Sequence, residues 1–177
     1  RGHAGGRAAA DRMRRRLGTP GLGAHSADAF SLRAAPAVLG TALDALRWVE
    51  STVTTELNGA CDNPLWFADE GVVEGGNFHG APVALAMDTL RIALTQVATQ
   101  SERRTFRLTS ASLSRDLPSF LVAGTGLNSG FMLAQYTAAS LASECKGLSH
   151  PASVDSIPTV QHHEDHVSMG PIAARLT

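Results

Sequence analysis

The chain has 177 residues, of which 44% are hydrophobic and 18% are charged. This composition is typical of a globular protein with one buried core, and it excludes a disordered tail and a charge-rich coiled coil. Because 15 basic residues nearly balance 16 acidic residues, with a formal net charge of -1, the chain has no general electrostatic attraction to nucleic acid.

The start of the chain is the local exception to this charge balance. Six arginines occur there with only Asp11 opposing them, namely Arg1, Arg7, Arg12, Arg14, Arg15 and Arg16. No aromatic residues interleave with them for base stacking, so we interpret the cluster as the solvated face of a helix.

The sequence carries no sign of a secretion signal or a membrane span. Its start lacks an apolar segment with a small-residue cleavage site, and no apolar run approaches the roughly 20 residues of a membrane helix. Its two cysteines, Cys61 and Cys145, are too few for a disulfide scaffold and too far apart for a zinc motif. We therefore expect a cytoplasmic protein with free thiols.

The spacing of apolar residues predicts four helices. In Ala35–Leu57 they recur every three or four positions, on one helical face. Ala81–Leu108 is apolar on more than one face and, at ~1.5 Å per residue, is roughly 40 Å long. A third helix is predicted over Gly130–Leu148 and a fourth from near Glu164 to the terminus. No period-2 pattern predicts a strand of useful length, so the predicted fold is all-α, a long-helix bundle in which residues 1–177 form a single helical segment.

A bundle of this size has too little interior to bury a long helix that is apolar on several sides. We therefore expect other chains to cover the remaining surface, in an intimate helical homo-oligomer or in a complex with a partner fragment. The helices would then contribute to a multi-subunit central core. In the isolated chain, several apolar side chains should be exposed.

Two long polar loops, at 58–80 and 149–160, are candidates for function. The first ends in Gly75-Gly-Asn-Phe-His-Gly80, so Asn77, Phe78 and His79 precede a long helix. Free amide groups and the helix dipole at such a position favour a small anionic substrate.

A cluster of imidazoles and carboxylates follows the second loop, and it consists of His162, His163, Glu164, Asp165 and His166. His162 and His166 are four residues apart, but the spacing is not that of a two-histidine zinc motif, so no metal is predicted. We interpret the cluster as groups that hydrogen-bond a polar substrate or assist proton transfer.

Seven segments along the chain match one enzyme family in order and spacing. They are Asp28-Ala-Phe-Ser-Leu-Arg33, Asp62-Asn-Pro-Leu65, Gly75-Gly-Asn-Phe-His-Gly80, Ser101-Glu-Arg-Arg104, Leu127-Asn-Ser-Gly-Phe-Met132, His150-Pro-Ala-Ser-Val-Asp-Ser-Ile-Pro158 and Glu164-Asp-His-Val-Ser-Met-Gly170. Over essentially its whole length the chain thus resembles the aromatic amino acid ammonia-lyases, and among them the histidine ammonia-lyases most of all.

The resemblance implies a helical homotetramer with active sites shared between subunits. Such enzymes eliminate ammonia from an amino acid with a methylidene-imidazolone electrophile, which forms from an internal Ala-Ser-Gly. This sequence contains no Ala-Ser-Gly, and its one Ser-Gly is Ser129-Gly130. We therefore expect an Ala-Ser-Gly-bearing segment from elsewhere, either a missing upstream half of the polypeptide or a separate subunit. Alone, the chain would not be a conventional lyase.

The resemblance also assigns roles to individual residues. Arg33 matches the arginine that pairs with the substrate carboxylate, a task that suits the guanidinium fork. Phe78 matches an aromatic wall of the substrate pocket. Glu164 matches the position that contacts the imidazole in histidine lyases, where a carboxylate favours a basic ring. His163 places a titratable imidazole beside Glu164.

Two family positions depart from the pattern at the predicted active site. Ala27 stands where the family has glutamine, and Phe30 stands at the catalytic tyrosine position. Removing one well-placed donor near a reacting centre costs on the order of 10²-fold in rate. Three interpretations stay open: conventional deamination of histidine, altered lyase or aminomutase-like chemistry, and a catalytically inactive structural partner.

Overall fold

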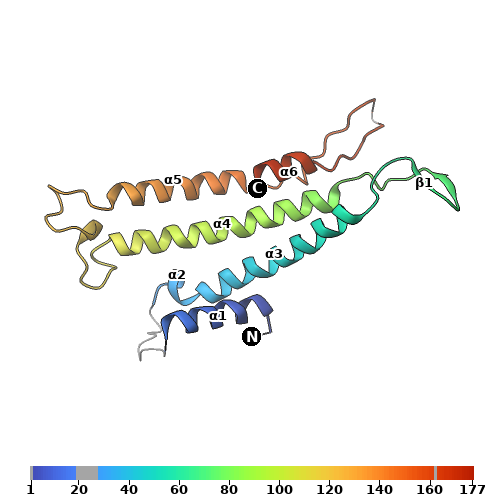
Figure 1. Ribbon diagram of the computed structural model, residues 1–177. Helices are drawn as coiled ribbons and strands as arrows, with labels where there is room; N and C mark the ends of the chain where they lie inside the picture. Colours follow the sequence, from blue (N-terminus) through green and yellow to red (C-terminus); the bar gives the residue numbers. More distant parts are fainter. Residues whose placement is uncertain (1, 19–27, 162) are drawn as a thin grey trace. The chain divides into compact units, whose positions relative to one another are not determined.

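The computed structural model describes residues 2–18, 28–161 and 163–177. In chain order its elements are α1 (Ala4–Leu17), α2 (Phe30–Arg33), α3 (Ala35–Asn58), β1 (Leu65–Phe67), β2 (Gly71–Val73), α4 (Ala81–Thr109), the 3-10 helix η1 (Ser119–Leu121), α5 (Met132–Leu148) and α6 (Gly170–Leu176). The structure is therefore mostly helical, which confirms the predicted fold class (Figure 1).

The two longest predicted helices are confirmed almost to the residue. The helix predicted over Ala35–Leu57 is α3, and the one predicted over Ala81–Leu108 is α4, each ending one residue later than expected. The third, α5, begins at Met132 rather than Gly130. The regular spacing of apolar residues is what made these helix ends predictable.

The fourth helix was predicted too early. It was expected from near Glu164, but α6 begins only at Gly170. The backbone at Glu164 is not helical, because Glu164 pairs with Thr159 in an isolated antiparallel bridge. Pro171, whose ring fixes a helical φ, then lies in the first turn of α6 and starts the helix there.

The structure also contains a small hairpin that the sequence did not predict. Strands β1 and β2 pair antiparallel, with Leu65 opposite Val73 and Phe67 opposite Gly71. Each strand has three residues, which is too few for an alternating pattern to show in the sequence.

The chain divides into two compact units. The first comprises Arg1–Asp44 and Ala93–Leu148, and the second comprises Ala45–Ile92 and Ser149–Thr177. Each unit is described separately below.

In the first unit, α1 packs closely against the start of α3 (Figure 1). A Cβ placed on Gly5 would lie 2.0 Å from the backbone oxygen of Gly40, so this approach requires glycine. The amide of Gly5 also donates a hydrogen bond of 2.8 Å to Asp44 Oδ1. The arginines Arg12, Arg14, Arg15 and Arg16 of α1 are exposed, which confirms the predicted solvated face.

Helix α5 lies along the part of α4 that belongs to the same unit (Figure 1). Thr95 on α4 donates its hydroxyl hydrogen to the backbone oxygen of Cys145 on α5, at 3.1 Å. Glu102 on α4 is buried and accepts hydrogen bonds from Arg103 and Gln135, which lower the pKa of its carboxyl group.

In the second unit, α6 lies beside the first part of α4 (Figure 1). Ala84, Ala152 and Ala173 are buried there, and Met87, Met169 and Ile172 pack against them. The hydroxyl of Thr177 donates to the backbone oxygen of Met87 at 3.1 Å. Alanines at the contact let the helix and the second loop approach α4 closely.

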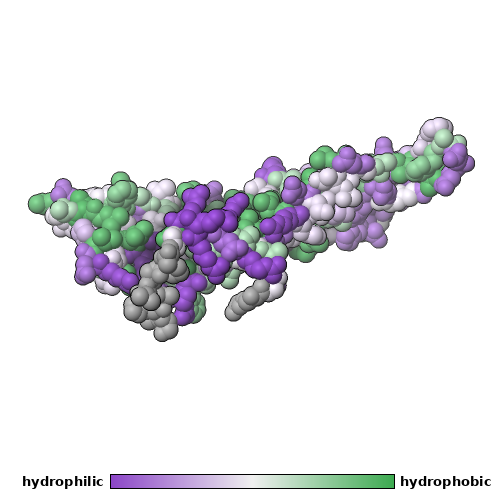
Figure 2. All heavy atoms as spheres, turned by 60° about the horizontal axis from the view of Figure 1, so that its bottom comes forward, coloured by the Kyte–Doolittle hydropathy of each residue, from purple (hydrophilic) through white to green (hydrophobic). Residues whose placement is uncertain are grey.

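The predicted exposure of apolar side chains is confirmed. In the described part of the chain, the fully buried apolar residues are alanines and one valine, Val49. Large side chains such as Leu133, Tyr136 and Leu141 on α5 are 55–66% exposed, and Figure 2 shows apolar surface on the face in view. No helix of the described residues is long and apolar enough to span a membrane.

Candidate functional site

The predicted site residues fall into two sets. Phe30 and Arg33 belong to the first unit, whereas Phe78, His163 and Glu164 belong to the second. Phe30 and Arg33 lie on one helix, α2, and the segments that carry Phe78 and Glu164 are joined by a contact between His79 and His166. Ala27 and His162 lie outside the described residues.

In the first unit, α2 carries Arg33 and Phe30 one helical turn apart. The amide of Arg33 donates to the backbone oxygen of Ala29 at 3.0 Å, which closes the turn. The guanidinium carbon of Arg33 lies 5.3 Å from the centroid of the Phe30 ring, a cation–π contact worth about 0.5–1 kcal/mol at an exposed site. Phe30 itself is 73% exposed and has no hydroxyl group to donate.

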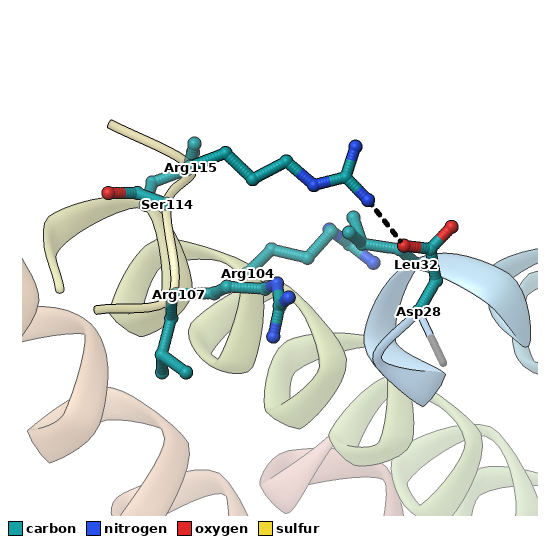
Figure 3. Close-up of a pocket in the computed structure, with 8 residues that line it drawn as sticks. Asp28, Leu32, Arg104, Arg107, Ser114 and Arg115 are labelled. Carbon is teal, nitrogen blue, oxygen red and sulfur yellow. Dashed lines mark hydrogen bonds and ion pairs between the residues drawn. The ribbon is translucent and has the colours of Figure 1, made fainter. Parts of the chain in front are cut away.

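A cavity of about 310 Å³ lies beside α2. It is lined by Asp28, Leu32, Arg104, Arg107, Leu108, Leu113, Ser114 and Arg115. Figure 3 shows Arg115 reaching toward Asp28, and their ion pair measures 2.9 Å. Arg104 donates to the backbone oxygen of Ser31 at 3.2 Å, so α4 contacts the middle of α2 directly.

In the second unit, a tight turn presents Glu164. Its backbone nitrogen and oxygen both bond to Thr159, at 3.3 Å and 3.0 Å, and its Oε2 accepts the Thr159 hydroxyl hydrogen at 2.7 Å. The amide of His163 donates to the backbone oxygen of Val160 within this turn, at 2.9 Å. Both His163 and Glu164 are exposed, so their side chains are accessible to a ligand.

The segment before α4 is built from loop-to-loop hydrogen bonds. Asn77 Nδ2 donates to the backbone oxygen of Ala60, and the amide of Gly75 donates to Asn63 Oδ1 at 2.8 Å. The Asn77 side chain thus links the segment before α4 to the loop at Ala60. Phe78 is 59% exposed.

A pair of histidines joins the Phe78 segment to the Glu164 segment. His79 Nε2 lies 3.3 Å from His166 Nδ1 and 3.2 Å from the His166 backbone oxygen. The two rings stack, with centroids 5.4 Å apart and planes inclined by 30°. The sequence had indicated both residues but not their contact. His79 follows Phe78 directly and His166 is two residues after Glu164, so their place in the sequence was the only indication that they lie near the candidate site.

A buried ion pair anchors the second loop, and sequence analysis missed it. Asp88 and Arg91, one turn apart on α4, form an ion pair with side chains 2% and 4% exposed. Asp88 Oδ2 accepts the amide hydrogen of Ser153 at 2.7 Å, and Arg91 donates to the backbone oxygen of His150 at 3.0 Å. The loop that leads to Glu164 is therefore fixed at its start.

The environment of Asp88 favours its ionised form. Burial alone raises the pKa of this carboxyl group, but hydrogen bonds from Ser153 and Ala152 and the charge of Arg91 lower it overall. Two further donors, Arg91 Nε and Nη1, find no acceptor among the residues that the structure describes. In the same part of the chain, no group of three or more His, Cys, Asp or Glu side chains is arranged to hold a metal ion.

Comparison with known proteins places the chain in a family. The sequence model described as aromatic amino acid lyase matches residues 1–177. The chain belongs to this family. The family predicted from the seven segments is thereby confirmed.

Relatives of this chain include several proteins named histidine ammonia-lyase. The one from Caldanaerobacter subterraneus subsp. tengcongensis is 60% identical over 149 residues, which is 84% of this chain and 29% of that protein. The one from Geobacillus thermodenitrificans is 58% identical over 148 residues, with the same coverage. The chain thus spans under a third of the length of these relatives.

Solved structures of the family share the fold. The crystal structure of histidine ammonia-lyase from Trypanosoma cruzi has a TM-score of 0.88 and 48% identity, and the match covers 99% of this chain and 33% of that chain. Tyrosine aminomutase from Streptomyces globisporus has a TM-score of 0.84 and 37% identity, and that match covers 99% and 38% of the two chains.

Proposed function

We propose that this chain supplies part of a shared active site that eliminates ammonia from histidine or a related amino acid. The observation that carries the proposal is the 60% identity to a histidine ammonia-lyase over 84% of the chain. The exposed carboxylate of Glu164, presented on its own turn, agrees with a basic ring as the group recognised.

In this proposal each unit of the chain contributes binding groups to the shared sites of the assembly. Arg33 binds the carboxylate, since a guanidinium can donate two parallel hydrogen bonds to its two oxygens. Phe78 packs against the ring, and Glu164 accepts a hydrogen bond from the imidazole N–H, with His163 beside it. Binding the ring and the carboxylate at once fixes the amino group and the neighbouring carbons in a reactive orientation.

The electrophile of the family must come from elsewhere in the assembly. The 177 residues contain no Ala-Ser-Gly from which a methylidene-imidazolone could form. We therefore assign this chain only the binding and orienting groups, and we propose that another segment supplies the electrophile. The exposed apolar side chains of α5, including Leu133 and Leu141, support assembly with further helices in a homo- or hetero-oligomer.

The test is an activity assay on the complete protein, isolated with any polypeptide that co-purifies. We expect urocanate from histidine, followed by its ultraviolet absorbance, and a KM for histidine about tenfold higher or more in Glu164→Gln, because a hydrogen bond between charged groups is lost. Glu70→Gln is the matched control, since Glu70 is an exposed carboxylate in the turn between β1 and β2. Equal effects of the two substitutions would contradict the role of Glu164.

A second candidate function is aminomutase-like chemistry. The likeness to tyrosine aminomutase, at 37% identity over nearly the whole chain, favours it. Chromatography distinguishes the two, because an aminomutase yields a β-amino acid and a lyase yields ammonia and an unsaturated acid. The same product analysis tests the third interpretation, since an assembly with a catalytically inactive partner would form neither product.

A further inference from the structure

The helix that carries Arg33 is too short to hold its own orientation. It has four residues, no side-chain cap and no buried residue. One isolated helical turn is unstable in water, because fixing the backbone of several residues gains a single hydrogen bond. Ala34 joins α2 to α3, because its amide donates to the backbone oxygen of Phe30 at 2.9 Å and its own oxygen accepts from the amide of Val38 at 3.1 Å. The direction in which Arg33 points therefore depends on α3 and on contacts from other elements.

Side-chain packing leaves α2 room to move. Leu32 of α2 lines the cavity of about 310 Å³ together with Leu108 and Leu113. Atoms that line a cavity lack close contacts on that side. Polar contacts therefore add to what holds α2 in place.

Two arginines from outside α2 provide such contacts. Arg104 on α4 is partly buried, donates to the backbone oxygen of Ser31 at 3.2 Å and is itself oriented by Gln100 Oε1 at 3.0 Å. Arg115 donates to Asp28 at 2.9 Å, as the dashed line in Figure 3 marks. Because the Arg115 side chain is 70% exposed, its ion pair is screened by solvent and contributes little. Arg104 is the stronger constraint.

We propose that Arg104 is a positioning residue that orients Arg33 for the substrate carboxylate, with a minor contribution from Arg115. This inference rests on the proposed function, in which Arg33 binds that carboxylate. A two-bonded carboxylate clamp works only in a narrow range of orientations, so a rotation of α2 weakens substrate binding without removing any group that touches substrate.

Kinetics of the complete enzyme assembly test the proposal. We expect Arg104→Met to raise the KM for histidine about tenfold, with a smaller change in kcat, and Arg104→Lys to recover part of the loss by donating to Ser31. Arg115→Met should change KM less than about threefold. Arg107→Met is the matched control, because Arg107 lines the same cavity from the same helix, but its side chain makes no hydrogen bond or ion pair with the described residues.

A double substitution separates positioning from general stability. If Arg104 acts through Arg33, adding Arg104→Met to Arg33→Met leaves KM unchanged, because the clamp is already absent. Additive losses, or an Arg107→Met effect equal to that of Arg104→Met, would overturn the proposal.

Hydrogen exchange tests the same contact independently of catalysis. The amides of Leu32, Arg33 and Ala34 bond to Ala29 and Phe30, so they report on the integrity of α2. We expect exchange there to be about tenfold faster in Arg104→Met than in wild type or Arg107→Met. Unchanged exchange would refute the constraint itself. Faster exchange in Arg104→Met would confirm the constraint, and failure of the wild-type assembly to bind an amino acid would then refute only the proposed function.

Discussion

Replacing Asp88 by alanine tests how the second loop is held on α4. The substitution leaves the Arg91 guanidinium, whose side chain is 4% exposed, without its ion-pair partner. It also removes the acceptor of the Ser153 amide hydrogen. Breaking a buried ion pair from one side costs about 3–5 kcal/mol, because the remaining charge stays buried and uncompensated. We expect Asp88→Ala to lower the free energy of unfolding by that amount.

Removing both charges should cost less than removing one. In Asp88→Leu combined with Arg91→Met, the loop loses its bonds to Ser153 and His150, which are 2.7 Å and 3.0 Å long. No buried charge is left behind, however, and apolar replacements of buried pairs are often neutral. The double variant should therefore be more stable than Asp88→Ala by at least about 1 kcal/mol.

Urea unfolding of the assembled protein measures these differences by linear extrapolation. The matched control is Asp11→Ala, because Asp11 and Arg14 form the same type of pair at the same spacing, with side chains 54% and 70% exposed. Such an exposed pair contributes roughly 0.5 kcal/mol or less. The reasoning is refuted if Asp88→Ala is no more destabilising than the control, or if the double variant is less stable than Asp88→Ala.

Three further outcomes are expected. Since the pKa of Asp88 is lowered in the folded chain, the stability that its charge provides is present above the unfolded aspartate pKa of about 4 and is lost as pH falls through the folded value. Acid titration of the unfolding free energy should show this loss in wild type but not in Asp88→Asn. His79→Leu, which removes the contact with His166, should raise the KM for histidine about tenfold in the urocanate assay, whereas His79→Gln, which keeps a hydrogen-bonding group, should raise it less. Phe30→Tyr combined with Ala27→Gln should raise histidine turnover roughly 10²-fold, and native turnover of about 1 to 10³ per second would contradict this.

The features of the fold that could be predicted from the sequence are those set by local residue patterns. A repeated apolar face defines α3 and α4 over many turns, so their ends could be predicted within one residue. The start of α6 was wrong because residues near Glu164 have ordinary helix-forming character, while the bridge to Thr159 directs the backbone into a turn. This bridge joins residues only five positions apart, so a local turn replaced the expected start of the helix.

The contacts that organise the candidate site could not be predicted in the same way. His79 and His166 are 87 residues apart, as are Asp28 and Arg115, and Asp88 is 65 residues from Ser153. No periodicity links such positions, because only the fold brings them together. Resemblance to a family assigned roles to Arg33 and Glu164, but it gave no information about what holds either side chain in place.

These supporting contacts explain how exposed side chains can still act with defined geometry. Glu164 is exposed, yet its turn is closed by Thr159, the loop leading to it is anchored on Asp88, and its neighbour His166 stacks on His79. An unsupported surface side chain samples several rotamers and loses that freedom when it binds a ligand, at a cost of about 0.5–1.5 kcal/mol. Fixing the backbone beneath Glu164 confines this loss to the side chain alone. Under the proposed function, in which Glu164 binds the ring, the contacts that fix its loop are therefore expected to influence substrate affinity.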